Sequence, residues 1–278
     1  MLKLALVQFQ VEPHAPEANL AKAERFVAQA AAAGAELVVF PEYFVTGPLG
    51  NRKDLADADG RYRAAFQAMA KGHGVDLVPG SIAESEGGRF HNTAYYIASD
   101  GSVPGRYRKV NLWVSEKLWV TPGEGAVVCD TRFGRVGLAI CWDLAFPELF
   151  RDMLRQGAEI VVCPSCWCFE DAGAGQRHNP RAEELFVDSL CVARAFENEV
   201  AVAFCNVAGE FDTPGGRRHS MGHSQVAVPF KGAVALLGHS DEAMLVAEID
   251  TSILSDAESA YEIRKDLAKA RGDDWMDG

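Results

Sequence analysis

Short apolar runs alternate with amphipathic stretches from one end of the chain to the other. Apolar residues at every second position predict a strand, and apolar residues three and four apart predict a helix. Residues 2–10 follow the first pattern, whereas Leu20, Ala23 and Val27 follow the second. The chain is therefore predicted to begin with a strand at 2–10 and a helix at 17–33.

The same two periods predict the other elements. Predicted helices cover residues 61–72, 147–156, 181–196 and 252 to about 270. Predicted strands cover residues 36–40, 75–83, 92–98, 103–109, 127–131, 135–141, 159–163, 200–206, 225–229, 233–236 and 244–249. Helices and strands that alternate in this way are typical of an α/β fold.

Two segments of nine residues are similar. Residues 34–42 (GAELVVFPE) and 157–165 (GAEIVVCPS) are identical at six positions. One interpretation is that this sequence pattern is common where a helix leads into a strand. The other is that the chain contains two βαβ units related by pseudo-symmetry. In the second case Glu42 and Ser165 stand at equivalent strand ends, where α/β proteins build their sites.

The composition is that of an ordinary globular protein. Of 278 residues, 48% are hydrophobic and 24% are charged, which excludes a disordered chain. Lys and Arg number 27 and Asp and Glu 39, so the net charge is −12 and no nucleic acid is expected as a partner. No linker divides the sequence, and we expect a single domain over residues 1–278.

Membrane segments and targeting signals are not expected either. The longest apolar runs, such as residues 136–141, are far shorter than the roughly 20 residues of a membrane-spanning helix. The N-terminus alternates like a strand and reaches Glu12 too soon for a signal peptide. Seven cysteines spread along a long chain favour free thiols in a reducing compartment. We therefore expect a soluble, cytoplasmic protein.

One cysteine stands where a nucleophile is expected. Cys141 ends the predicted strand at 135–141, and a turn leads from it into the predicted helix at 147–156. Backbone N–H groups at such a turn favour negative charge, so we expect them to lower the pKa of this thiol and to bind an oxyanion. The alternative is a buried structural cysteine.

A nucleophilic thiol needs a base, and none of the seven histidines stands at a comparable strand end. Glu42 does, because it follows the apolar run 37–40, and its apolar neighbours would raise its pKa towards that of a useful base. Alternation places Lys109 on the same strand face as Tyr107. The alternatives are an exposed loop carboxylate for Glu42 and a solvated basic edge for Lys109.

A metal site is the alternative chemistry. Cys163, Cys166 and Cys168 lie close together, but their spacing lacks the second pair of ligands that a structural zinc site needs. His219 and His223 are four residues apart, but the glutamate of the H-E-x-x-H pattern is missing. We expect no metal site and keep a non-catalytic binding or metal-storage protein as an alternative.

Three motifs carry a resemblance to a known family. They are FPEY at 40–43, YRKVNLW at 107–113 and ICWDLAFPE at 140–148. Glu42 and Lys109 are 67 residues apart, and Cys141 follows 32 residues later. In residue types, order and spacing, the chain resembles the nitrilase superfamily of carbon–nitrogen hydrolases over nearly its whole length. Further similar segments are TPG at 121–123, RAFEN at 194–198 and GHS at 222–224.

The resemblance implies a fold and an assembly. The fold would be a four-layer αββα sandwich, built as one domain with two pseudo-symmetric halves. The chain would form a homodimer or a larger homo-oligomer, with the C-terminal helix and tail, about 251–278, at a subunit interface. No metal or organic cofactor is implied.

The resemblance also implies roles for individual residues. Cys141 would be the nucleophile, Glu42 the general base, and Lys109 the stabiliser of the oxyanion together with the backbone N–H of Trp142. Many members use a second glutamate ahead of a Pro-Gly turn, and Glu116 matches it here. Tyr43, Trp113, Trp142 and Trp167 are expected to form an apolar substrate pocket.

The implied reaction is hydrolysis of a primary amide or an N-carbamoyl amine, which releases ammonia through a cysteine thioester. The alternative is a nitrilase, although nitrilases usually show Cys-Trp-Glu where this chain has an aspartate, Asp143. Members that bind a carboxylate often carry an arginine shortly after the cysteine, where this chain has Leu144 and Ala145. We therefore expect neutral or cationic amides to be preferred, unless a cation such as Arg177 supplies the clamp.

Overall fold

The central strand of the molecule is apolar on both of its faces. A computed structural model describes residues 1–213 and 215–271. In strand β1 (Leu2–Gln10), Leu4 and Leu6 point into one hydrophobic cluster, and Val7 and Phe9 point into another. Because successive side chains of a strand point to opposite faces, β1 is covered by protein on both sides.

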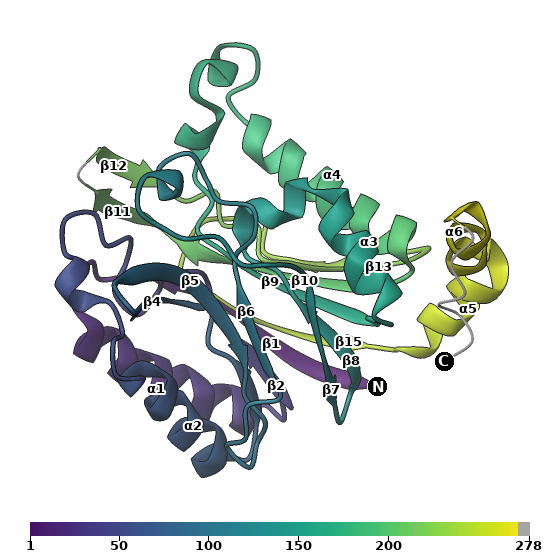
Figure 1. Cartoon of the computed structure of the whole chain (residues 1–278), viewed down its shortest axis with the longest axis horizontal. Helices are drawn as coiled ribbons and strands as arrows, with labels where there is room; N and C mark the ends of the chain where they lie inside the picture. Colours follow the sequence, from purple (N-terminus) through teal and green to yellow (C-terminus); the bar gives the residue numbers. More distant parts are fainter. Residues whose placement is uncertain (214, 272–278) are drawn as a thin grey trace.

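The first half of the fold surrounds β1 directly. Strand β1 pairs in parallel with β2 (Leu37–Val39), which pairs with β3 (Asp76–Val78), and β15 (Ala243–Ile249) pairs antiparallel on the other edge. Strands β4 (Ser81–Glu86), β5 (Arg89–Tyr96) and β6 (Gly105–Arg108) form an antiparallel sheet beside it. Helices α1 (Pro16–Ala32) and α2 (Arg61–His73) cover the outer face (Figure 1).

The second half has a matching construction. Its strands are, in order across the sheet, β7 (Val127–Thr131), β8 (Gly134–Leu138), β9 (Ile160–Ser165), β10 (Ala201–Ala208), β13 (Gln225–Val228) and β14 (Gly232–Leu236). Helices α3 (Pro147–Arg155) and α4 (Ala182–Asn198) cover its outer face (Figure 1).

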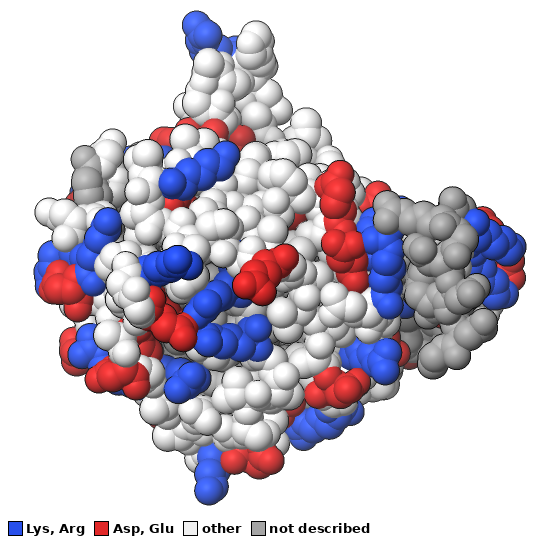
Figure 2. All heavy atoms as spheres, viewed as in Figure 1, with Lys and Arg blue, Asp and Glu red and all other residues white. Residues whose placement is uncertain are grey.

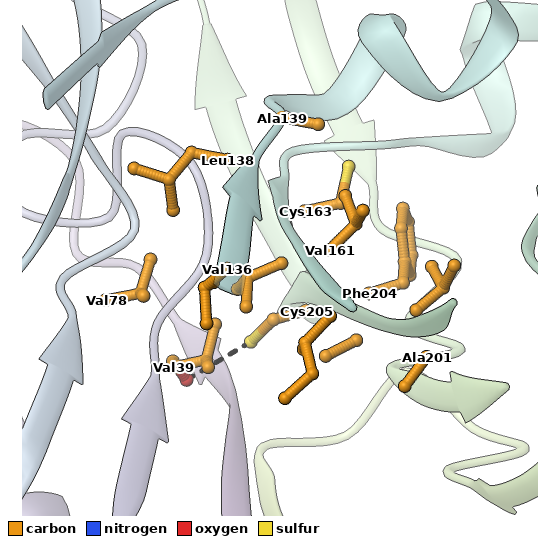
Figure 3. Packing of buried hydrophobic residues seen from close by; sticks show 14 of the residues in the cluster. Val39, Val78, Val136, Leu138, Ala139, Val161, Cys163, Ala201, Phe204 and Cys205 are labelled. Atoms are coloured by element: carbon orange, nitrogen blue, oxygen red, sulfur yellow. Dashed lines mark hydrogen bonds between the residues drawn. The ribbon is translucent and has the colours of Figure 1, made fainter. Parts of the chain in front are cut away.

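The two halves join where β1 pairs in parallel with β10. Phe9 lies opposite Val207, and Gln10 lies opposite Ala208. The sheet then curls so that its halves face each other across one apolar core. Figure 3 shows Val39 and Val78 of the first half opposite Val136 and Leu138 of the second. The layers are therefore helix, sheet, sheet and helix, and the predicted αββα sandwich is confirmed.

The two similar segments of the sequence occupy equivalent places in the two halves. Residues 34–42 lead into β2 and residues 157–165 into β9. The ends of these segments meet, because the backbone N–H of Glu42 donates to the carbonyl of Ser165 at 3.2 Å. This contact agrees with the pseudo-symmetric interpretation of the repeat.

The structure departs from the predicted elements in three places. The strand expected at 75–83 is divided at Gly80 into β3 and β4. The helix expected from 252 to about 270 is broken at Glu262, whose φ of 51° ends α5 (Ser252–Tyr261) before α6 (Ile263–Arg271). A hairpin of β11 (Glu210–Thr213) and β12 (Gly216–His219) lies in a region for which no element was predicted.

Short 3-10 helices complete the fold. They are η1 (Lys53–Leu55), η2 (Glu116–Leu118), η3 (Cys141–Ala145) and η4 (Phe169–Arg177). Residues 272–278 of the C-terminal tail lie outside the described residues, and its place at a subunit interface stays a prediction, as does the single domain over 1–278.

The surface carries both signs of charge. Lysine and arginine are interspersed with aspartate and glutamate on the face drawn in Figure 2. Within residues 1–213 and 215–271, we find no helix that is long and apolar enough to span a membrane.

The division at Gly80 leads to a prediction about stability. Gly80 has a φ of +62°, and a β-carbon there would lie 1.8 Å from the carbonyl oxygen of Pro41. Gly74 has a similar φ of +67° with no atom within 4 Å of its β-carbon position, so it is a matched control. Gly80→Ala should lower the free energy of unfolding by about 3 kcal/mol or more, and Gly74→Ala by about 1 kcal/mol.

Urea unfolding of the two variants measures this difference. Equal losses of unfolding free energy in the two variants would contradict the account. They would mean that only the positive φ, which both sites share, matters and that the close approach of Pro41 to Gly80 does not. Gly80→Ala should also reduce activity, since Pro41 immediately precedes Glu42.

Candidate active site

The predicted site residues gather around one cavity of ≈ 420 Å³. The residues that line it include Glu42, Lys109, Glu116 and Cys141. They come from four different segments, since they follow β2, β6 and β8 or begin η2. The structure thus brings together polar groups that are up to 99 residues apart in the chain, from Glu42 to Cys141.

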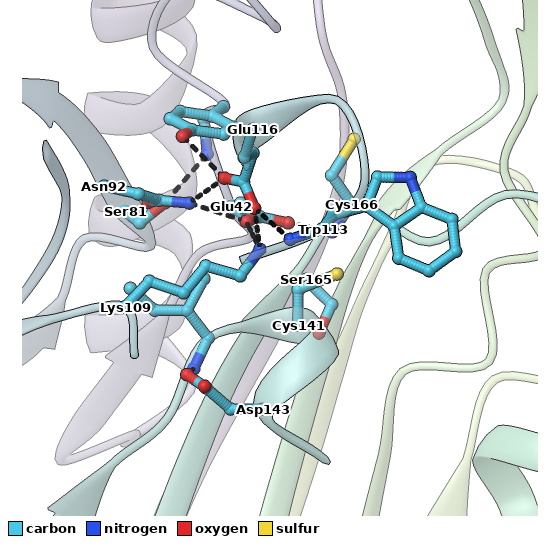
Figure 4. Close-up of polar contacts among 12 residues, drawn as sticks. Glu42, Ser81, Asn92, Lys109, Trp113, Glu116, Cys141, Asp143, Ser165 and Cys166 are labelled. Carbon is cyan, nitrogen blue, oxygen red and sulfur yellow. Dashed lines mark hydrogen bonds and ion pairs between the residues drawn. The ribbon is translucent and has the colours of Figure 1, made fainter. Parts of the chain in front are cut away.

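Lys109 is the centre of the polar cluster. Its Nζ donates to Oε1 of Glu42 at 2.8 Å and to Oε2 of Glu116 at 2.7 Å (Figure 4). The side chain is only 1% exposed. A solvated basic edge is therefore the wrong interpretation of this residue, and Lys109 bridges two buried carboxylates.

Glu42 is held by donors on both oxygens. Besides Lys109, its Oε1 accepts from the side chain of Asn92 at 2.8 Å, and its Oε2 accepts from the backbone N–H of Cys166 at 3.0 Å. The residue is 3% exposed. An exposed loop carboxylate is therefore excluded, and its orientation is fixed by three donors.

Glu116 is also buried, and it has one partner that is distant in the sequence and one that is nearby. Oε1 accepts from the hydroxyl of Tyr43 at 2.8 Å, and Oε2 accepts from the backbone N–H of Trp113 at 2.9 Å. An exposed ion pair with Lys117, the simplest alternative for this residue, is not formed. The carboxylate faces Lys109 instead.

Asn92 is a member of the cluster that the sequence did not indicate. Its Nδ2 lies 2.8 Å from Oε1 of Glu42 and 2.8 Å from Oε1 of Glu116, so one amide bridges both carboxylates (Figure 4). It lies within β5, on a fully buried position. The signal that could have indicated Asn92 is its amide side chain within a strand, because a polar group that is buried there needs hydrogen-bond partners.

Burial and neighbouring charges set the ionisation of these groups. Burial raises the pKa of Glu42; Lys109 opposes the shift, and the Glu116 carboxylate adds to it. Burial acts on Glu116 in the same direction, but Lys109 and the donors from Trp113 and Tyr43 lower its pKa. Burial opposes the charge of Lys109, yet the two carboxylates raise its pKa well above its ordinary value. Glu116 is thus the charged partner of Lys109, and Glu42 is the more basic carboxylate.

Cys141 is the first residue of η3 and has a left-handed backbone, with a φ of 49°. Asp143 holds this strained turn. Its carboxylate accepts from the backbone N–H of Ile140 at 2.9 Å, from the hydroxyl of Tyr107 at 2.7 Å, and from two N–H groups of Asn111 at 2.9 Å. Strain of this kind costs about 1–3 kcal/mol and persists only where the surroundings fix it.

The thiol of Cys141 is not activated by its turn. Burial and the Glu42 carboxylate raise its pKa well above the ordinary value, and the opposing effects of Lys109 and the Cys166 backbone N–H do not reverse the shift. The lowered pKa expected from the sequence is therefore wrong. The physical reason is that the thiol is fully buried and that the negative charge of Glu42 opposes its ionisation.

Aromatic side chains form the walls of the cavity. Tyr43, Trp113, Trp142 and Trp167 all line it, and Trp119 lines it as well. The rings of Trp113 and Trp142 meet edge to face with centroids 4.6 Å apart, and those of Trp142 and Trp167 are 5.6 Å apart. Of these residues, Tyr43 also belongs to the polar cluster through its hydroxyl.

The hairpin β11–β12 forms part of the cavity wall and was missed in the sequence. Phe211 and Arg218 of this hairpin line the cavity. Among the described residues, the cations that line it are Lys109 and Arg218. Arg177, the cation considered from the sequence, does not line it, and Leu144 is fully buried in the core.

The three neighbouring cysteines face different surroundings. Cys166 and Cys168 line the cavity, whereas the thiol of Cys163 lies 3.7 Å from the hydroxyl of Ser165 in the core. Over the part of the chain that the structure describes, no cluster of three or more His, Cys, Asp or Glu side chains is arranged to hold a metal ion.

Comparisons with known proteins agree with this geometry. The chain matches the family model described as carbon-nitrogen hydrolase over residues 3–258. It is 30% identical over 272 residues to the 2-oxoglutaramate amidase of Bacillus subtilis, which covers 95% of this chain and 98% of that protein. It is 32% identical over 257 residues to a nitrilase of Pyrococcus abyssi, with 90% of each chain covered.

A solved structure is similar over the same range. It is a mutant of the amidase from Nesterenkonia sp. AN1, with a TM-score of 0.78 and 26% sequence identity. The similarity covers 96% of this chain and 100% of the amidase chain. That structure shows acrylamide added to its active-site cysteine.

Proposed function

This chain belongs to the carbon–nitrogen hydrolase family and is an amidase-type hydrolase; from that premise we propose that it cleaves primary amides or N-carbamoyl amines through a thioester on Cys141. The observation that carries the proposal is that Cys141, Glu42 and Lys109 line one cavity, in which the Lys109 ammonium donates to the Glu42 carboxylate at 2.8 Å. A nucleophile, a base and an electrophilic stabiliser thus meet in one apolar cavity.

The first step is attack by sulfur on the carbonyl carbon. Because the thiol is neutral, Glu42 takes its proton as the C–S bond forms, and the raised pKa of Glu42 suits it to hold that proton. The carbonyl oxygen becomes negative and is stabilised by Lys109 and the backbone N–H of Trp142. Donors preorganised for a developing oxyanion contribute about 3–4 kcal/mol each.

The second step releases ammonia and restores the thiol. Protonated Glu42 gives its proton to the amide nitrogen as the C–N bond breaks, which leaves a thioester on Cys141. Glu42 then takes a proton from water as the water attacks the thioester carbon. The C–S bond breaks, the acid leaves, and Cys141 regains its proton from Glu42.

Glu116 completes the proposed catalytic group. Its Oε2 accepts from the Lys109 ammonium, as Oε1 of Glu42 does, and its charge helps to keep that ammonium protonated. We assign Tyr43, Trp113, Trp142 and Trp167 to the substrate pocket because they line the cavity above this group. No step requires a metal ion or an organic cofactor.

The nitrilase alternative is not favoured. The relatives include amidases as well as a nitrilase, and the solved neighbour is an amidase. Asp143, the residue that distinguishes this chain from the usual nitrilase motif, supports the turn and is fully buried. A non-catalytic metal-storage role has no support in the positions of Cys163, Cys166 and Cys168. Two further parts of the proposal rest on the sequence: assembly as a homodimer or larger homo-oligomer, and a cytoplasmic location.

The first prediction of this mechanism concerns the nucleophile. Cys141→Ala should abolish ammonia release from a panel of amides, carbamoyl amines and nitriles while the melting curve stays unchanged. Cys166→Ala should retain most activity, because alanine keeps the backbone N–H that binds Glu42. Mass spectrometry of substrate-treated enzyme should find the acyl group on the peptide with Cys141, and an adduct on Cys166 would refute the assignment.

The second prediction concerns Glu116. Glu116→Gln removes the charge facing Lys109 and should lower kcat about a hundredfold without unfolding the protein. Glu116→Asp should also be poor, because one methylene moves the carboxylate further than such geometry tolerates. Lys117→Ala, an exposed neighbour, is the control and should match the wild type.

Steady-state kinetics with melting curves measures these effects. If both Glu116 variants stay within a factor of two or three of the wild type, Glu116 does not belong to the catalytic group, and Glu42, Lys109 and Cys141 act as a triad.

A further inference from the structure

Hydrogen-bond donors fill the two buried carboxylates of the site to different extents. A carboxylate has about four acceptor positions, two on each oxygen. Oε1 of Glu116 accepts from the hydroxyl of Tyr43 and from Nδ2 of Asn92. Oε2 of Glu116 accepts from Nζ of Lys109 and from the backbone N–H of Trp113. Every position of Glu116 is therefore taken, and none is left for a proton or for the substrate.

Glu42 keeps one acceptor position. Its Oε1 accepts from Nζ of Lys109 and from Nδ2 of Asn92, each at 2.8 Å, so both positions of this oxygen are taken. Among the described residues, the donor to its Oε2 is the backbone N–H of Cys166, at 3.0 Å, which leaves one position on that oxygen. Cys141 lies on the same side of Glu42 as Cys166, away from Asn92 (Figure 4). Oε2 of Glu42 can therefore take a proton without the loss of a donor.

We propose that Asn92 is the positioning residue that directs the catalytic proton, because its two N–H groups occupy Oε1 of both carboxylates. The proton of the Cys141 thiol is thereby led to Oε2 of Glu42. Glu116 stays ionised and takes no part in proton transfer. This inference rests on the proposed function and deepens it, since it assigns the general base to one oxygen atom and names the residue that selects it.

The carboxylates decide the orientation of the Asn92 amide. Within the described part of the chain, Oδ1 of Asn92 is buried without a hydrogen-bond partner. A buried acceptor in this condition costs stability, so its presence needs a reason. The reversed amide would place Oδ1 against Oε1 of Glu42 and Oε1 of Glu116, where like partial charges repel. The amide therefore leaves its own oxygen unpaired while it supplies both carboxylates with a donor.

The sheet fixes the position of Asn92 beside Lys109. Asn92 lies in β5, the central strand of the β4–β5–β6 sheet. Its carbonyl accepts from the backbone N–H of Lys109 at 2.9 Å, so the two residues are neighbours across the end of β6. Groups held on strands are positioned more precisely than groups on loops. The amide and the ammonium thus approach the carboxylates from one rigid support.

The reaction depends on this difference between the two carboxylates. As the C–S bond forms, the S–H bond of Cys141 breaks and its proton joins Oε2 of Glu42, while the π electrons of the carbonyl move to its oxygen. The same proton passes to the amide nitrogen as the C–N bond breaks. Two neighbouring carboxylates with open oxygens share a proton, and the base would then be protonated before the reaction starts. A donor on each Oε1 opposes this, because it favours the charged form of both groups.

The test replaces Asn92 by leucine, which is similar in size and has no donor. Loss of both donors should raise the pKa of the carboxylates and move the acidic limb of the pH profile of kcat/KM upward by about one pH unit. On the plateau of the profile, kcat should fall about tenfold or more, because Glu116 now competes for the proton, and KM should change less than about threefold. Asn92→Ser keeps one donor at most and should move the limb in the same direction by less.

The other titratable groups beside Glu42 are unchanged in both variants, so the shift reports the lost donors. These groups are Tyr43, Lys109, Glu116, Cys141 and Cys166. Ammonia release measured against pH, with a melting curve for each variant, gives all of these quantities.

Thr93→Val is the matched control. Thr93 is the next residue of β5, and its hydroxyl donates to the buried carboxylate of Glu84 at 2.8 Å. Glu84 does not line the cavity, and successive side chains of a strand point to opposite faces. This variant also removes a donor from a buried carboxylate, but its kcat and its acidic limb should match those of the wild type.

The inference is overturned if the Asn92 variants lose activity equally at every pH and keep the acidic limb of the wild type, since a merely structural role predicts that result. It is also overturned if Thr93→Val moves the limb as far as Asn92→Leu does. Failure of the proposed function is a different result: the wild type itself would release no ammonia through Cys141.

Discussion

The ammonium of Lys109, buried between the carboxylates of Glu42 and Glu116, is the interaction on which the rest of the site depends. None of these three charges could be buried alone, because removal of one partner from a buried ion pair costs about 3–5 kcal/mol. The chain must therefore bring the ends of β2 and β6 and the start of η2 to one point. The ends of β2 and β9 also meet there, which brings the backbone N–H of Cys166 to the Glu42 carboxylate.

The same arrangement explains how the site divides its chemical tasks. Lys109 is committed to two carboxylates, so it does not convert the neighbouring thiol into a thiolate. Cys141 stays neutral, and a separate base has to remove its proton during attack. Glu42 is that base because burial makes its carboxylate more basic, and Asn92 donates to both carboxylates where they lie close together. The cost of the strained Cys141 backbone is offset by the hydrogen bonds that Asp143 accepts.

Sequence patterns were most informative where local structure and chemistry coincide. Glu42, Lys109 and Cys141 could be found because each follows an apolar or alternating strand, and the period-two pattern of β1 and β7 gave their bounds correctly. Asn92 and Arg218 could not, since their partners are distant in sequence and lie on other elements. The direction of the Cys141 pKa shift was also beyond the sequence, because it depends on burial and on a carboxylate 99 residues away. The break at Glu262 was missed because the apolar period continues across it.

The ionisation of Cys141 tests the central claim most directly. The thiolate absorbs in the ultraviolet, and the difference between the wild type and Cys141→Ala, recorded against pH, isolates this thiol from the six other cysteines. If Lys109 belongs to the two carboxylates, the Cys141 thiolate should appear only above its ordinary pKa of 9.0 and be absent at neutral pH. Glu42→Gln, which removes the adjacent negative charge, should move its appearance to lower pH. A Cys141 thiolate already present at neutral pH in the wild type would contradict the account.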